Sequence, residues 1–311
     1  MNSKIYKLSA LFFFLTIASF YFSCKKDDKK DDTTPITTTS TDKDASVAED
    51  NETAESEFEE VFNYVDEESN TNDNLRTTGG DIDTFFVNPT RYACVDTVRF
   101  KRSGSLLNPP IKKEIRFIFD SSKTCNNGSR RMGKIVAKME GAYKKLGTVV
   151  TITFEDFYVQ RPNMTKWIHI QGTKTITMKA ATTTSRTINV KVTGAKLTWM
   201  QPDSATAKIS WQSDRTREVT VSNSEPFKTV KFYGTASGVT RKNKAYSAVV
   251  DSTTALIKKS NCKWIVSGKL TITRTDSTTI KERTLDYGDG TCDDKATVKL
   301  ASGDTVQIRL R

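Results

Sequence analysis

Histidine is nearly absent from this sequence, which contains a single one, His169, in 311 residues. One imidazole removes most routes to histidine-based acid–base catalysis and to His-rich metal sites. The sequence also lacks a nucleophile elbow, a phosphate-binding loop, zinc-ligand spacing and a dinucleotide-binding fingerprint. Because His169 alternates with Ile168 and Ile170, we interpret it as a solvent-facing or interface side chain. We therefore predict no catalytic residue and no cofactor, and an enzyme stays only as an alternative.

Long apolar segments are also scarce, and the one that is present runs from Leu8 to Phe22. Two lysines precede it and Ser23-Cys24 follow it, which is the order of an export signal, and the run is short for a membrane span. An uncleaved single-span anchor and an ordinary secretory signal are the alternatives. Because no second long apolar segment follows, we expect nothing beyond the anchor to enter the bilayer.

The region around Cys24 resembles the signal peptide and lipobox of a bacterial lipoprotein. The resemblance implies cleavage before Cys24, acylation of its thiol and of the new amino group, and a place in the outer membrane. The lysine and aspartate pairs of Lys25–Asp32 resemble the surface-export tag of Bacteroidota lipoproteins, which implies exposure at the cell surface. Tyr21 departs from the lipobox, where an aliphatic residue is usual. Two or more acyl chains would make the anchor permanent.

Four cysteines remain after Cys24, and an even number in an exported chain favours disulfides over metal ligands. They are Cys94, Cys125, Cys262 and Cys292. Turn-forming residues lie at the midpoint of each neighbouring pair, Asn108-Pro109-Pro110 in the first and Thr275–Thr278 in the second. Opposed residues of a hairpin lie within disulfide reach. We therefore predict two local disulfides, Cys94–Cys125 and Cys262–Cys292.

Charge is segregated along the chain. Residues 42–83 contain 15 acidic and 2 basic residues, a net of −13, whereas residues 84–311 contain 18 acidic and 40 basic residues, a net of +22. Residues 84–311, which we call the basic body, would attract acidic polysaccharide, lipopolysaccharide, nucleic acid or the chain's own acidic residues 42–83. Alternatively, lysines on exposed strands only deter edge-to-edge aggregation. We expect no specific nucleic-acid partner and a monomer.

The chain divides into five segments. We expect a signal peptide at 1–23, a disordered tether at 24–44, an acidic amphipathic helix at 45–69, a loop at 70–83 and a basic antiparallel β domain at 84–311. The helix carries apolar residues on one face and acidic residues on the other. Its apolar face consists of Ala54, Phe58, Val61, Phe62 and Val65. Because a lone helix is marginal in water, we expect this face to pack on the basic body.

Residues 84–311 alternate apolar and polar residues with period two. Val150, Ile152 and Phe154 share one strand face, for example, and threonines occupy much of the other. Turn residues separate many such short runs, and no helical period of useful length intervenes. This pattern predicts an all-β fold, an antiparallel β-sandwich or a barrel-like sheet.

The densest acidic cluster of the basic body lies at residues 286–294. Its carboxylates are Asp286, Asp289, Asp293 and Asp294. They are a weak candidate for a Ca²⁺ loop, because Ca²⁺ prefers several oxygen ligands from a flexible turn. The favoured interpretation is a strand-to-strand turn, in which aspartates cap backbone amides and glycines supply positive φ. We accordingly predict no metal site.

Two further groups of residues have a chemical and a structural interpretation. Glu155 and Asp156 are adjacent on a predicted strand and point to opposite faces, so they cannot form the carboxylate pair of a glycosidase. Aromatic residues offer a stacking platform for sugars, although core packing is the favoured interpretation. These residues are Trp167, Trp199, Trp211, Trp264, Phe232 and Tyr233.

Several strings of the β region resemble a family of uncharacterised Bacteroidota surface lipoproteins. They are Gly133–Ile135, Val150–Tyr158, Gly172–Thr177, Gly234–Gly238, Cys262–Gly268 and Tyr287–Cys292. The likeness covers most of residues 54–310 and implies an exported all-β body behind an acidic segment, with no assigned activity. We therefore expect a lipid-anchored binding or structural module of the cell envelope that takes acidic polymers. A carbohydrate-active enzyme or an accessory glycan-binding protein is the alternative.

Overall fold

The computed structural model describes residues 45–71, 82–86, 93–105, 108–200, 207–221, 228–277, 283–300 and 303–310. All of them belong to one compact unit, residues 41–311. The predicted signal peptide and the whole of the predicted tether, including Cys24, lie outside the described residues.

The fold is all-β and antiparallel with one helix before the sheet, as the sequence predicts. The helix α1 spans Ala45–Thr71, against the expected 45–69. The strands are β1 Ile82–Phe86, β2 Val95–Ser105, β3 Asn108–Phe119, β4 Arg130–Glu140, β5 Val149–Gln160, β6 Ile168–Ala181, β7 Ser185–Trp199, β8 Lys208–Val221, β9 Lys228–Val239, β10 Ala245–Val250, β11 Leu256–Lys259, β12 Ile265–Arg274, β13 Arg283–Asp289, β14 Lys295–Lys299 and β15 Thr305–Arg309. A short 3₁₀ helix, η2, covers Ser252–Thr254.

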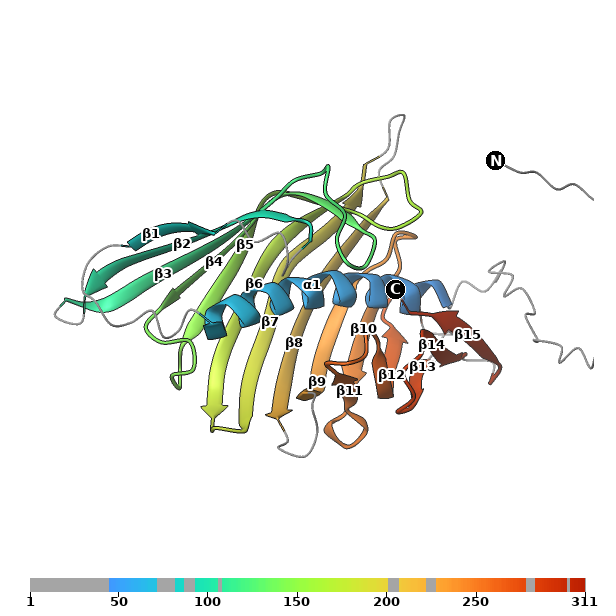
Figure 1. Ribbon diagram of the computed structural model, residues 1–311. Helices are drawn as coiled ribbons and strands as arrows, with labels where there is room; N and C mark the ends of the chain where they lie inside the picture. Colours follow the sequence, from blue (N-terminus) through green and yellow to red (C-terminus); the bar gives the residue numbers. More distant parts are fainter. Residues whose placement is uncertain are drawn as a thin grey trace, which may run out of the picture. The chain divides into compact units, whose positions relative to one another are not determined.

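These strands form one continuous 15-stranded sheet within the described residues. Each strand from β1 to β10 pairs with the next one in the sequence, and β12 to β15 continue the same order. The short β11 pairs with both β9 and β12, beside β10. Figure 1 shows that the sheet is strongly curved and that α1 runs across its strands on the concave side.

Glycines and bulges bend the long strands. A Cβ at Gly133 of β4 would lie 1.9 Å from the carbonyl oxygen of Asp156 in β5, and one at Gly234 of β9 would lie 2.3 Å from that of Asp214 in β8. Only glycine permits such an approach of two backbones. The pairing register between β4 and β5 shifts at Gly133, as it does at a β-bulge. Bulges increase the local twist of a sheet, which here curves it around the helix.

The core lies between the concave face of the sheet and α1. The five residues of the predicted apolar helix face, residues 54, 58, 61, 62 and 65, are all buried. They pack against inward-facing strand residues such as Trp211 and Phe154, whose rings lie 5.6 Å from that of Phe58 between centroids. The predicted docking of the helix on the basic body is thus confirmed.

Candidate functional site

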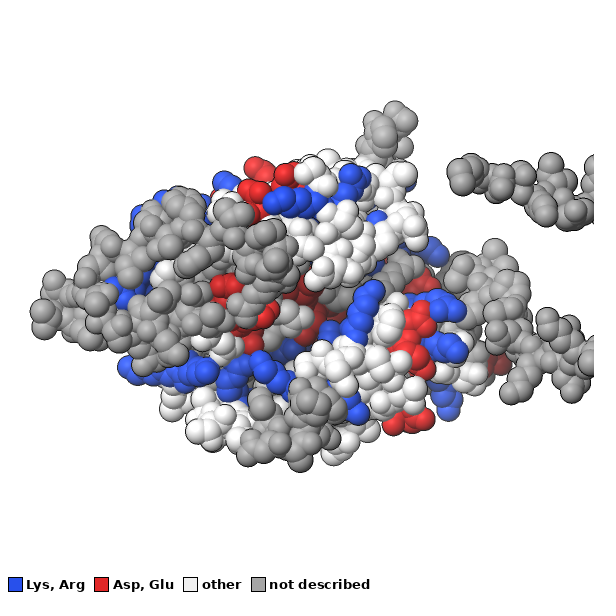
Figure 2. Space-filling view, in the orientation of Figure 1, with Lys and Arg blue, Asp and Glu red and all other residues white. Residues whose placement is uncertain are grey.

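The acidic side of α1 is also covered by the sheet, because arginines of the concave face pair with its carboxylates. Six of these pairs are Arg241 with Asp50, Arg215 with Glu55, Arg161 with Glu57, Arg217 with Glu59, Arg131 with Glu60 and Arg186 with Asp66. Five of the pairs have nitrogen–oxygen distances of 2.5–2.8 Å. In Figure 2, acidic side chains lie in the hollow occupied by α1, with basic side chains around them.

Both nitrogens of an arginine fork take part in several of these pairs. Arg186 donates from Nη1 and Nη2 to the two carboxylate oxygens of Asp66, at 2.8 and 3.0 Å. Arg217 binds Glu59 in the same two-pronged way. Burial alone would raise the pKa of Glu59, but the adjacent Arg217 outweighs it and lowers that pKa to about 2. Such charge-assisted, buried pairs hold the helix in one position along the sheet.

A lysine on the same face has a different role. The Lys174 ammonium donates a hydrogen bond to the main-chain carbonyl of Phe58 in α1 and lies 5.3 Å from the ring centre of Phe62. Burial lowers the pKa of Lys174 to about 7, although the nearby Glu59 opposes the shift. The protein's own helix therefore packs against the concave face and pairs with many of its cationic side chains.

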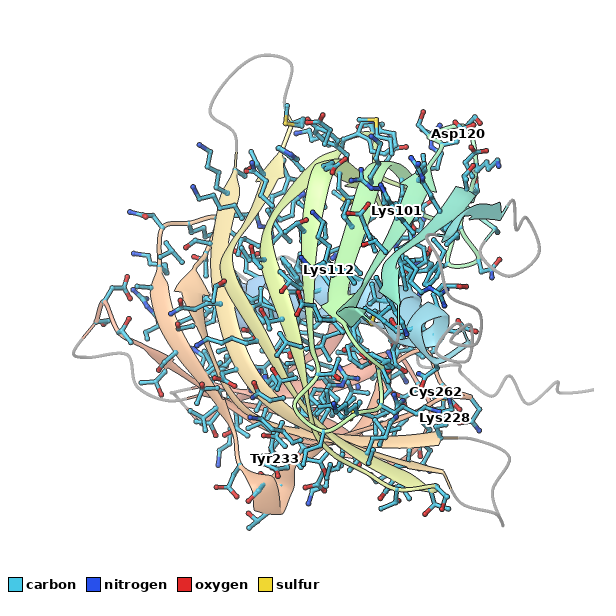
Figure 3. The ribbon with its side chains drawn as sticks, turned by 90° about the vertical axis from the view of Figure 1, so that its left-hand side faces the viewer. Lys101, Lys112, Asp120, Lys228, Tyr233 and Cys262 are labelled. Atoms are coloured by element: carbon cyan, nitrogen blue, oxygen red, sulfur yellow. A yellow bond between two sulfur atoms is a disulfide. The ribbon has the colours of Figure 1, made fainter. Side chains whose placement is uncertain are left out.

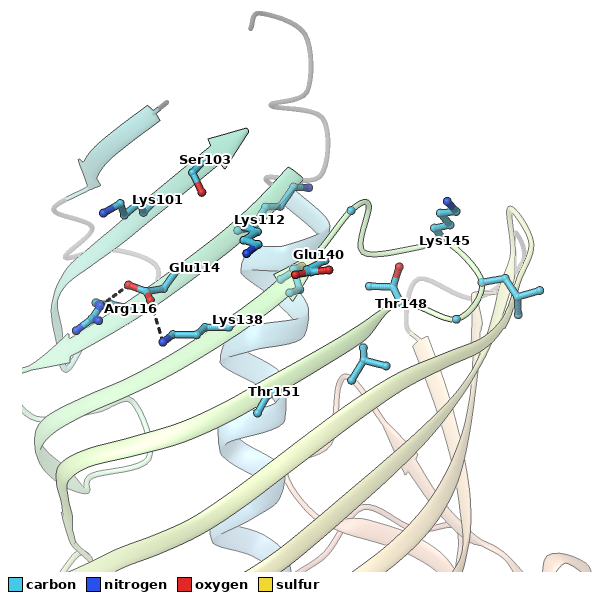
Figure 4. Close-up of a pocket in the computed structure, with 16 residues that line it drawn as sticks. Lys101, Ser103, Lys112, Glu114, Arg116, Lys138, Glu140, Lys145, Thr148 and Thr151 are labelled. Atoms are coloured by element: carbon cyan, nitrogen blue, oxygen red, sulfur yellow. Dashed lines mark hydrogen bonds and ion pairs between the residues drawn. The ribbon is translucent and has the colours of Figure 1, made fainter. Parts of the chain in front are cut away.

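The convex face carries an open groove of about 910 Å³ over strands β2 to β5 and the β4–β5 loop. Outward-facing residues of neighbouring strands form its floor, as Figure 4 shows. The strand register places Lys101, Glu114, Lys138 and Thr151 side by side in one row across β2, β3, β4 and β5. The loop forms one rim with Lys145 and Leu146.

Positive charge dominates this groove. Its lining includes Lys101, Lys112, Lys113, Arg116, Lys138 and Lys145, against the acidic residues Glu114 and Glu140. Glu114 is neutralised locally, because Arg116 Nε lies 2.5 Å and Lys138 Nζ 3.5 Å from its carboxylate. Within the described part of the chain, Lys101, Lys112 and Lys145 have no ion-pair partner. Figure 3 shows Lys101 and Lys112 on this side of the sheet. Such a surface attracts anions.

The structure contains two disulfides, Cys94–Cys125 and Cys262–Cys292, the pairs that the spacing predicts. Each joins the two ends of a hairpin, β2–β3 or β12–β13. The expected turn residues Asn108-Pro109-Pro110 instead begin β3, and residues 106 and 107 before them lie outside the described ranges. Arg131 donates to the Cys125 sulfur, at 2.6 Å, so the first disulfide also contacts the helix-binding face.

Three of the four aspartates of residues 286–294 behave as the turn interpretation predicts. Asp286, Asp289 and Asp293 each accept a hydrogen bond from a backbone amide two residues later. Hydrogen bonds from the Thr291 side chain and from its backbone amide lower the pKa of the Asp289 carboxyl. Asp294 pairs with Arg309 instead. Across the described residues, no three His, Cys, Asp or Glu side chains lie close enough together to hold a metal ion.

The remaining candidates from the sequence, Glu155, Asp156 and His169, have different surroundings. Glu155 pairs with Arg116 and Lys134 on the convex face, and Asp156 has a φ of 44° at a bulge. His169 is half-buried and stacks on Tyr158, with 4.4 Å between ring centroids.

The aromatic residues divide between the core and the surface. Trp199, Trp211 and Phe232 are buried, as the core interpretation predicts. Tyr233 donates to Glu218 at 3.0 Å, and Trp167 and Trp264 are half-buried beside Arg130 and Lys263.

The groove is the feature that sequence reasoning missed. Its signal was present as alternating charged residues, Lys112, Glu114 and Arg116 on β3, and Lys138 and Glu140 on β4. Alternation shows that such residues share a face, but it does not show which strands lie side by side. In the sequence, the basic residues are spread along residues 84–311, and their convergence on one groove is not visible there.

No helix among the described residues is long and apolar enough to cross a membrane. Searches of protein-family models, of curated proteins and of solved structures found no match to this chain.

Proposed function

We propose that this protein is an exported binding module, anchored by lipid on Cys24 at the outer surface of the outer membrane, which binds acidic polymers through its convex face. It acts as a monomer without catalytic turnover. The observation that carries the proposal is the basic groove, in which Lys101, Lys112 and Lys145 are exposed and form no ion pair among the described residues, with Lys112 opposite Glu140 in the strand register.

The charge distribution supports this assignment over attraction by the whole surface. The arginines of the concave face are already paired with α1, so they contribute little to the field outside. Residues 42–311 keep a net charge of −13 plus 22, or +9. Distributed positive charge raises the rate of encounter with polyanions and gives salt-sensitive binding of low sequence specificity.

Binding of the chain from residue 24 with Cys24→Ser, which carries no acyl chain, tests the groove. We expect a sulfated polysaccharide to bind at low salt, to weaken severalfold at high salt, and a neutral dextran not to bind. Lys112→Gln with Lys145→Gln should weaken binding. The matched control is Lys196→Gln with Lys208→Gln, two exposed lysines of β7 and β8 outside the groove.

Two results would contradict the proposal. Equal binding of neutral and sulfated polymers, unchanged by salt, would indicate a sugar platform of aromatic residues. Hydrolysis of any polymer that is lost in Glu140→Gln, a carboxylate of the groove, would indicate an enzyme.

The anchor is tested separately by intact-mass analysis of the native protein. The expected species begins at Cys24 and carries the mass of its acyl chains. A soluble, unacylated protein in which Cys24 lies mid-chain would contradict this part of the proposal. Replacing Lys25–Asp32 with serine should keep the acylated protein inside the cell.

A further inference from the structure

One rim of the groove carries the most exposed large apolar side chain of the described residues. Leu146, in the β4–β5 loop, is 70 % exposed, and Val149 at the start of β5 is 44 % exposed. Exposed lysines, Lys144 and Lys145, immediately precede Leu146. A single exposed leucine is ordinary on a protein surface, so its position matters only if the loop holds it there.

The loop is held in place at several points. The Thr148 hydroxyl donates to the carbonyl of Ala142 at 2.7 Å, and the Gly147 amide donates to the carbonyl of Met178 in β6 at 2.9 Å. Tyr143 is buried, and its hydroxyl donates to Asp66 of α1 at 2.6 Å. The loop is therefore fixed to both the sheet and the helix, which holds Leu146 at the rim of the groove.

The exposed Leu146 lies next to the lysines of the groove. Lys145 and Leu146 line the same groove as Lys112 and Lys138. An apolar tip among cations matches an anionic lipid surface, where the apolar group enters the acyl boundary and the cations meet the headgroup phosphates. A soluble acidic polymer would use the lysines alone and leave Leu146 in water.

We propose that the β4–β5 loop docks the groove onto a bilayer surface with anionic phosphate headgroups, with Leu146 and Val149 inserted and with Lys112 and Lys145, unpaired among the described residues, on the headgroups. The inference rests on the proposed function, because it assigns the acidic groups bound by the groove to lipids in a membrane. One leucine and a few lysines give weak attachment by themselves. A lipid anchor on the same chain would make it effective by raising the local concentration.

The test is sedimentation of the Cys24→Ser chain with vesicles of phosphatidylcholine, with and without phosphatidylglycerol. We expect binding that requires phosphatidylglycerol and falls about tenfold in Leu146→Ser, because the leucine no longer leaves water. Lys145→Gln should reduce the same binding by about fivefold at low salt. Val149→Ser should also reduce the binding. The matched control, Val249→Ser, should not, because Val249 is 45 % exposed on β10, away from the groove.

Binding to a soluble sulfated polysaccharide, measured on the same variants, separates this inference from the proposed function. Leu146→Ser should bind the polysaccharide as the parent chain does. Polysaccharide binding without vesicle binding, or vesicle binding unchanged by Leu146→Ser, would overturn the docking and leave the binding function intact. Binding to neither would overturn both. Unchanged urea midpoints of the variants verify that they are folded.

Discussion

The two faces of the same sheet use positive charge in opposite ways. On the concave face, arginines from β4, β7, β8 and two loops each bind one carboxylate of α1. On the convex face of β2 to β5, most of the cations are lysines, and several have no acidic partner in the described structure. The guanidinium fork suits buried, two-pronged pairing, and the strongly hydrated ammonium suits exposure. The comparison shows that the net charge of the basic body overstates the positive charge that its concave face leaves available to a binding partner.

The largest expected effect comes from breaking one concave pair. Arg217→Met leaves the Glu59 carboxylate buried without its partner, and the free energy of unfolding should fall by about 3–5 kcal/mol. Lys101→Met on the convex face should change it by no more than about 0.5 kcal/mol. Urea denaturation measures both. Similar losses in the two variants would show that the arginine pairs do not hold the helix.

Acid should weaken the same contact. The pKa of Glu59 is lowered from 4.5 to about 2 in the folded protein, so its contribution to stability is complete above pH 4.5 and is lost as the pH falls toward 2. The loss from this group should be on the order of 3 kcal/mol. Unfolding free energies across this range measure it. The double variant Glu59→Gln with Arg217→Met should lack this part of the pH dependence, and an unchanged acid slope would contradict the assignment.

Lys174, on the concave face, is expected to destabilise the folded protein. Its pKa falls from 10.5 to about 7 on folding, so the unfolded chain binds its proton more readily, and stability declines as the pH falls from 10.5 to 7. Lys174→Met should therefore raise the unfolding free energy by about 2 kcal/mol near neutral pH, by the usual gain from replacing a buried charge. The gain should shrink steadily above neutral pH. A gain that does not depend on pH would indicate better packing alone.

The smallest effect tests whether arginine and lysine are interchangeable on each face. Arg215→Lys removes the fork that binds Glu55 and the carbonyl of Gly234, and it should cost about 1–2 kcal/mol. Lys196→Arg on the convex face should stay within about 0.5 kcal/mol of the parent. Thermal or urea unfolding of the two variants gives the comparison. Equal tolerance on both faces would remove the distinction between them.

Local patterns predicted much of the fold. The period of 3.6 in residues 54–65 and the period of two after residue 84 predict a helix and strands, because each reflects only neighbouring residues. The disulfides were predictable for the same reason, since each closes a hairpin of about 30 residues, short enough to be inferred from its own turn. The expectation that the helix docks also needed no more than its unpaired apolar face.

Local patterns could not predict which arginine pairs with which carboxylate of α1. Arg131 and Glu60 are 71 residues apart in the sequence, and Arg241 and Asp50 are 191 apart. Which cation meets which carboxylate depends on the register of every intervening strand and on the bulges that bend them. A slip of one residue in β4 would move Arg131 to the convex face.

The sequence by itself determined the element types, the local disulfides and the opposite charges of helix and body. Only the tertiary structure decided that the helix carboxylates are buried and individually paired, and that the lysines of β2 to β5 converge on one groove. The physical reason is that periodicity assigns a residue to a face of its own strand. The order and register of the strands then decide which side chains meet across that face.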